Sequence, residues 1–348
     1  MNKKYDIPEP IIDKKEETTI DALTESYNKL IEPGYISKVG KKAEKIIPSK
    51  VKKFGKSIGN TISEKELYIQ MMKLIEEGFK TIEEQASKYS VNEKQIIKKV
   101  NKKSNYKISE LSEICLVRSY DLASIVSTYK TQDIFTAMLE GAGTGAFGFL
   151  GLPFNIVLST FLFFRAVQSI AMFYGYDIKN EPAELIIAAD VFTKALNPSE
   201  DPIDSEKVNI IGKIMIMTQT ELVKQTSKKT WTDMASKGGI PLLLTQMRAL
   251  ANKSAQKAIE KAGRTGLENS VFKDTFEQIG RKLTLKSTGK LAFGISALFG
   301  ALIDTAQMKK VLEYADIFYQ KRFILEKENR IANLVDDNSS EIEVEKVD

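Results

Sequence analysis

Apolar residues recur three and four positions apart over most of the chain, which is the spacing of helices. Between residues 63 and 103, capping-box patterns each precede such a run and predict two or three helices. The same spacing predicts helices over residues 108–139, 205–224, 241–261 and 304–330. Alternating strand patterns bounded by turn residues are scarce. The pattern therefore predicts an all-α, multi-helical fold.

An uncharged run, residues 141–164, stands out in a chain of which 28% is charged. Its first part is rich in glycine, its last part in phenylalanine and leucine, and it is long enough to cross a bilayer. We place a helix from Pro153 to Tyr174, just before Gly175, and its 22 residues span about 33 Å. Another helix opens at Pro182, because proline is tolerated in a first turn.

Arg165 lies just past the middle of the first of these helices. A central arginine costs a membrane span about 2.5–3.5 kcal/mol. Small and polar residues share one face of the helix, with Arg165 near its edge: Asn155, Ser159, Ala166 and Ser169. A lipid-facing span has no use for such a face, whereas a helix packed closely on another helix does. The pattern therefore favours close helix packing over a simple span.

A second apolar stretch, residues 291–303, is the candidate partner for this helix. Small residues, among them Gly300, recur every four positions on one of its faces and allow close approach. A buried charge without a partner is strongly destabilising. We therefore expect Arg165 to form an ion pair with Asp304 or Glu140.

The amino-acid composition excludes several classes of catalytic and metal-binding site. The 348 residues include no histidine, which excludes histidine general bases, Ser-His-Asp and Cys-His nucleophiles and His-ligated zinc. The single cysteine, Cys115, lies in an apolar run, so we expect a buried thiol in a reducing compartment. Residues 1–19 lack the apolar core of a signal peptide, which predicts an intracellular protein.

Residues 143–148 fit the G-x-G-x-x-G pattern of dinucleotide sites. Such a site needs a preceding strand and an acidic residue about twenty positions later. Here a helix-like stretch precedes the glycines, and the first later acid is Asp177. Close packing between helices explains the glycines better, and we expect no cofactor and no bound metal ion.

Basic charge is concentrated in residues 38–56, which hold eight lysines and one acid, with apolar residues between them at helical spacing. Such a segment is typical of contact with an anionic membrane surface, at about 1 kcal/mol per lysine. A solvated helix docked on its own domain explains the pattern equally well. Nucleic acid is disfavoured, because arginine and interleaved aromatic residues are absent. The lysines expected at a membrane are Lys41, Lys42, Lys45, Lys50, Lys52, Lys53 and Lys56.

We divide the chain into three parts. Residues 1–60 form a flexible basic segment whose first 37 residues are a mobile lead-in. Residues 61–330 form a helical domain in which the two glycine-rich apolar elements pack together. Residues 331–348 form a disordered acidic tail, with six acids against one lysine from residue 336 onward.

The glycine-rich element and the residues after it resemble the EcsC protein family over about residues 64–330. The match includes Tyr174-Gly175-Tyr176-Asp177 and, near the C-terminus, Gly294, Ala301, Ala315 and Tyr319. The resemblance implies a helical, mainly bacterial family, named from a gene beside an ABC-type exporter and without an established reaction. Its motif residues here are Glu140, Gly141, Gly145, Gly148, Gly151, Pro153, Arg165, Gly175, Asp177, Gly300 and Asp304.

These patterns favour a non-catalytic protein at the cytoplasmic face of a membrane, attached peripherally, and they are also compatible with insertion into the bilayer. It would bind lipid or a membrane protein, for which an ABC-type transporter is one candidate. Two alternatives stay open. One is a soluble helical domain whose apolar stretches are core. The other is an enzyme that acts on a lipid-type substrate through Glu140, Arg165 and Asp177.

Overall fold

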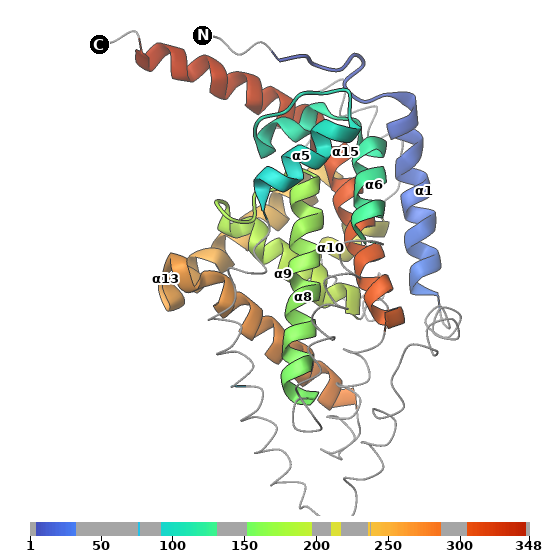
Figure 1. Ribbon diagram of the computed structural model, residues 1–348, viewed down its shortest axis with the longest axis vertical. Helices are drawn as coiled ribbons and strands as arrows, with labels where there is room; N and C mark the ends of the chain where they lie inside the picture. Colours follow the sequence, from blue (N-terminus) through green and yellow to red (C-terminus); the bar gives the residue numbers. More distant parts are fainter. Residues whose placement is uncertain are drawn as a thin grey trace, which may run out of the picture.

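The computed structural model describes residues 5–32, 76, 92–130, 152–196, 210–216, 236, 238–286 and 305–345. Within these ranges the chain forms helices and no strand, which confirms the all-α prediction. The elements, shown in Figure 1, are α1 (Lys14–Ile31), α5 (Glu93–Lys103), the 3₁₀ helix η3 (Leu111–Leu116), α6 (Ser119–Thr128), α8 (Leu152–Phe173), α9 (Pro182–Leu196), α10 (Ile210–Ile216), α13 (Ile240–Lys286) and α15 (Thr305–Glu345).

Helix α15 lies at the centre of the molecule (Figure 1). It packs against α1, η3, α6, α8, α9 and α10. Between residues 310 and 327 nearly all of its side chains are buried, including those of charged residues. A helix covered on every side must find partners for its polar groups inside the protein.

Helix α8 begins and ends where its sequence predicts. Its last two turns are buried, and Phe161 and Phe164 both contact Phe272 of α13, with ring centroids 5.1 and 5.6 Å apart. Helix α13 is bent at Gly263, where the backbone is not helical. Among the described residues, no helix combines the length and the apolar character that a membrane crossing requires.

Helix α1 corrects the expectation of a mobile lead-in for residues 14–31. Asp13 and Glu16 form a capping box that starts the helix. Ile20, Leu23 and Tyr27 recur at helical spacing on its buried face, together with Leu30. This periodicity is present in the sequence, but prolines on either side of it suggested an irregular segment.

One further expectation needs correction. The helix predicted over residues 108–139 is divided, because Val117 and Arg118 have extended backbone angles between η3 and α6. Its remainder after residue 130 lies outside the described residues. At the other end of the chain, α15 extends to Glu345.

Candidate functional site: a buried ionic core and four helix ends

Helix α15 carries four charged side chains into the core. Lys321, Arg322, Glu326 and Lys327 are each at most 1% exposed. Moving such charges out of water is expensive, so each must be paired or hydrogen-bonded. Their partners come from α1, α9, α10 and α13, which makes this cluster the link between α15 and its neighbours.

Arg322 forms the centre of the cluster. Its guanidinium holds the carboxylate of Glu184 from α9 with two hydrogen bonds, Nη1–Oε2 at 2.6 Å and Nη2–Oε1 at 2.7 Å. The planar fork matches the carboxylate geometry, which lysine could not do. The guanidinium also lies 3.9 Å from the ring centre of Tyr176.

Glu326 lies one helical turn after Arg322 and stays ionised. Its Oε2 accepts hydrogen bonds from Arg248 of α13 at 3.0 Å and from the Tyr176 hydroxyl at 3.1 Å. Burial raises the pKa of Glu326, but the guanidinium groups of Arg322, Arg248 and Arg330 outweigh burial and lower it overall. A carboxylate held in this way is unsuited to donate or accept protons near neutral pH.

The predicted motif residue Gly175 ends α8 in a left-handed conformation, with φ of 77°. Arg330 donates to the carbonyl oxygens of Tyr174 and Gly175, both at 2.8 Å, and so satisfies the end of the helix. A Cβ atom on Gly175 would lie 2.8 Å from the carbonyl oxygen of Leu111 and 2.5 Å from Nη2 of Arg330. Only glycine fits here, so the residue has a structural role.

The side chains of Tyr174 and Asp177, on either side of the turn at Gly175, also stabilise the fold. The hydroxyl of Tyr174 donates to Asp316 of α15 at 2.7 Å. Asp177 accepts hydrogen bonds from the backbone N–H groups of Lys179 and Asn180, at 2.9 and 3.0 Å. The Tyr-Gly-Tyr-Asp motif therefore fixes the connection between α8 and α9.

Arg165 is paired, as its burial demands, and its partner is Glu268 of α13, with Nη2 and Oε2 2.8 Å apart. Burial lowers the pKa of Arg165 and raises that of Glu268, and each charge offsets only part of the shift in the other. Nε of Arg165 and Oε1 of Glu268 make no hydrogen bond within the described part of the chain. The pair therefore joins α8 to α13 without recovering the full cost of burial.

The carboxylate of Glu16 in α1 is also fully buried. Nζ of Lys327 lies 2.8 Å from its Oε1 and 3.1 Å from its Oε2. Nη1 of Arg118 lies 3.1 Å from Oε2, and the backbone N–H of Ser119 donates to Oε1 at 2.8 Å. Two cations and the N-terminus of α6 thus surround one carboxylate.

Lys321 is buried where α1, α10 and α15 meet. Its Nζ donates to the hydroxyl of Thr24 at 2.5 Å and to the carbonyl oxygen of Met215 at 2.9 Å. Burial lowers its pKa to about 7, and Asp21 only partly opposes the shift.

Sequence reasoning missed this ionic core. A signal was present in α15, where Lys321-Arg322 lie close between the apolar runs 317–319 and 323–325 and Glu326-Lys327 follow the second run directly. Charged residues at buried helical positions indicate partners elsewhere, but they do not identify them. Glu184 and Glu268 have no local pattern that marks them, and the local pattern at Glu16 indicates only a capping box with Asp13.

The other predicted site residues fall outside the described ranges: Glu140, Gly141, Gly145, Gly148, Gly151, Gly300, Asp304, Lys41, Lys42, Lys45, Lys50, Lys52, Lys53 and Lys56. Pro153 lies in the first turn of α8, as expected. Arg165 and Asp177 make separate contacts, with Glu268 and with the turn before α9. No group of acidic or cysteine residues suited to hold a metal ion occurs among the described residues.

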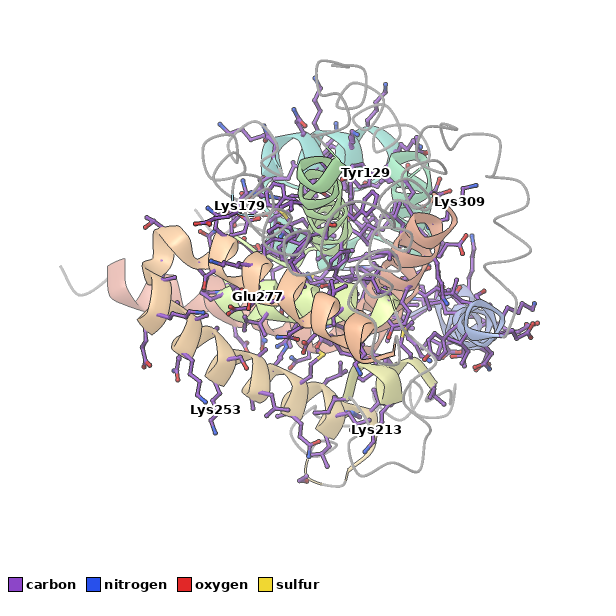
Figure 2. All side chains as sticks on the ribbon, turned by 90° about the horizontal axis from the view of Figure 1, so that it is seen from below. Tyr129, Lys179, Lys213, Lys253, Glu277 and Lys309 are labelled. Carbon is purple, nitrogen blue, oxygen red and sulfur yellow. The ribbon has the colours of Figure 1, made fainter. Side chains whose placement is uncertain are left out.

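Four helix ends lie at one end of the molecule. Helix α1 runs antiparallel to α15, since its Glu16 meets Lys327 and its Tyr27 meets Tyr314. The last part of α13 runs antiparallel to α8, as the contacts of Glu268 and Phe272 show. The C-terminal ends of α1 and α13 and the N-terminal ends of α8 and α15 therefore point to the lower end of Figure 1. Figure 2 looks from this end, with α1 and α8 seen along their axes.

Three segments connect at these ends. Residues 33–75 follow α1 and contain the lysine-rich segment. Residues 131–151 precede α8 and contain the glycine-rich start of the uncharged run. Residues 287–304 join α13 to α15 and contain the second apolar stretch. The helix ends that lead into the basic segment and into both apolar stretches thus point in the same direction.

Comparison with protein families finds a match to the EcsC protein family over residues 24–324. The match begins inside α1, earlier than the motif residues alone suggested. It includes Glu184, Arg248 and Arg322 of the ionic core, whereas Glu16, Glu326 and Lys327 lie just outside it. Comparisons with curated proteins and with solved structures find no match. Because the matched region covers most of its 348 residues, the chain belongs to the EcsC protein family.

Proposed function

We propose that this protein is a non-catalytic helical protein that attaches to the cytoplasmic face of a membrane. It contacts the membrane with the end of the molecule at which segments 33–75, 131–151 and 287–304 are attached. The observation that carries the proposal is the common direction of the four helix ends that lead into these segments.

The composition of these segments suits a lipid surface. Residues 38–56 supply eight lysines against one acid, and each lysine near an anionic surface contributes about 1 kcal/mol. Residues 141–151 and 291–303 carry no charge. Electrostatic attraction and apolar contact at one site are the two contributions that hold peripheral proteins on membranes.

An enzyme that uses Glu140, Arg165 and Asp177 is less well supported. Arg165 is committed to Glu268, and Asp177 accepts the backbone N–H groups of a turn. The buried carboxylate of Glu326 is held ionised by guanidinium groups, as a structural carboxylate is. These contacts stabilise the fold and leave their groups no evident part in proton transfer.

Flotation with vesicles tests the proposal. We expect co-flotation with vesicles of anionic phospholipid at low salt, weaker co-flotation at high salt because of screening, and none with neutral vesicles. Replacing Lys41, Lys42, Lys45 and Lys52 by glutamine should abolish it. The matched control replaces four exposed lysines on α5 and α13, namely Lys98, Lys102, Lys253 and Lys257. Absence of co-flotation, or equal loss in the control, would count against a membrane contact at this end.

A further inference from the structure

The surroundings of Glu16 form an oxyanion site in which the bound anion belongs to the chain itself. Each oxygen of the carboxylate accepts more than one hydrogen bond, and the donors come from α15, from Arg118 and from the start of α6. The N–H of Asp13 also approaches Oε2, at 3.3 Å. All of these donors would suit a phosphate group equally well.

The N-terminus of α6 is otherwise uncapped. Arg118 occupies the N-cap position, and its side chain makes no capping hydrogen bond. The backbone N–H of Ser119 therefore depends on Glu16 for its acceptor. The hydroxyl of Ser119 is buried and has no hydrogen-bond partner in the described part of the chain. Its O–H group is therefore a further donor that a bound anion could use.

The contact between α1 and α15 is polar at its centre. Lys321 and Lys327 are both fully buried beneath α1, and burial lowers the pKa of each, against the opposing effect of Asp21 and of Glu16 respectively. An interface that buries ammonium groups gains less free energy than an apolar one of the same size. Helix α1 is thus held on α15 by its apolar face and also by ionic contacts, in which another anion can take the place of the Glu16 carboxylate.

We propose that the buried donors around Glu16 form a binding site for a phosphate-type oxyanion, which Glu16 occupies as an internal ligand and from which an external ligand displaces it. Lys327 and Arg118 are the charged ligands, and the N–H of Ser119 is the third donor. Displacement of Glu16 releases the start of α1, the helix that leads toward the basic segment. The site lies well away from the C-terminal end of α1, so this inference does not depend on membrane attachment.

Chemical rescue tests whether the site binds an anion. Glu16→Ala removes the internal ligand and leaves both cations unpaired, so inorganic phosphate at constant ionic strength should raise its Tm by at least about 2 °C more than that of the wild type. Glu25→Ala, on the exposed face of the same helix, is the matched control and should respond like the wild type. In Glu16→Ala/Lys327→Met the added effect of phosphate should disappear. An equal response in all four proteins would overturn the proposal.

Hydrogen exchange on the wild-type chain provides a second measurement that does not depend on a variant that folds poorly. We expect phosphate to accelerate amide exchange in the first two turns of α1 while exchange in α9 stays unchanged. A second arm replaces phosphate by phosphatidylcholine vesicles that contain phosphatidate. Acceleration in the phosphate arm identifies a soluble ligand, and acceleration with vesicles alone identifies a lipid headgroup. Unchanged exchange of α1 in both arms contradicts displacement.

Discussion

At the scale of single residues, the dominant feature is a set of buried charges that support one another. Arg322, between Glu184 and Glu326, is the clearest case. Arg165 was predicted to pair with Asp304 or Glu140, but it pairs with Glu268 instead. The identity of that partner could not be predicted, because residues 165 and 268 meet only through the packing of α8 on α13.

Removing one member of the central pair should be costly. In Glu184→Gln, Arg322 stays buried and loses the closer of its two carboxylates, so we expect a loss of about 3–5 kcal/mol in the free energy of unfolding. Urea denaturation measures this loss. Glu25→Gln removes an exposed pair with Lys29 and should leave the midpoint unchanged. Similar midpoints for the two variants would mean that the buried pair contributes little.

Lys321 should make stability depend on pH. Its pKa falls from the ordinary 10.5 to about 7 in the folded protein, so between these values the unfolded chain binds more protons. The stability of the wild type therefore rises with pH across this window. Lys321→Met lacks this titration. The free energy of unfolding of the variant should therefore exceed that of the wild type most at pH 6, by a few kcal/mol at most, and the difference should shrink progressively toward pH 10. Melting curves at several pH values measure the difference, with the exposed Lys309→Met as control. A difference independent of pH would contradict the assignment.

At the scale of elements, helices with strong local signals were predictable and their interruptions were not. Helix α8 was predicted to within a residue at each end, and α9 starts at Pro182 as expected. Helix α1 has the same apolar spacing, but the sequence did not show that this face packs on α15 and makes the segment part of the core. The break before α6 depends on Arg118 reaching Glu16, a contact 102 residues apart that no local pattern records.

Gly175 should tolerate no side chain. Alanine there would adopt a left-handed conformation and meet the backbone oxygen of Leu111, which cannot move as a side chain can. We expect Gly175→Ala to lose at least about 1–2 kcal/mol of stability. Gly212→Ala is the control, because this glycine lies inside α10 with nothing within 4 Å of an added Cβ. That variant should be as stable as the wild type or slightly more so. Equal losses at both positions would refute the steric argument.

At the scale of the whole molecule, the central claim is that one end of the bundle contacts a membrane. The sequence showed a basic segment and two apolar stretches, but it could not show that the ends of α1, α8, α13 and α15 that lead into them point the same way. Ion pairs hold these helices in that arrangement, because Glu16–Lys327 joins α1 to α15 and Arg165–Glu268 joins α8 to α13. The charges therefore support the proposed function indirectly, by orienting the helices.

The mode of attachment has its own test. Electrostatic and shallow apolar contact predicts that alkaline carbonate releases the protein from membranes, whereas an inserted hairpin would stay with the pellet. We expect release. Retention after the wash would replace peripheral attachment by insertion.

Hydrogen exchange with and without anionic vesicles tests the central claim most directly, because it reports which part of the surface meets the lipid. Protection should appear in residues 38–56, 141–151 and 291–303 and in the helix ends next to them, while α5 and the C-terminal half of α15 keep their rates. Protection of α5 or α9 instead, or no protection in the three segments when the protein is bound, would contradict it.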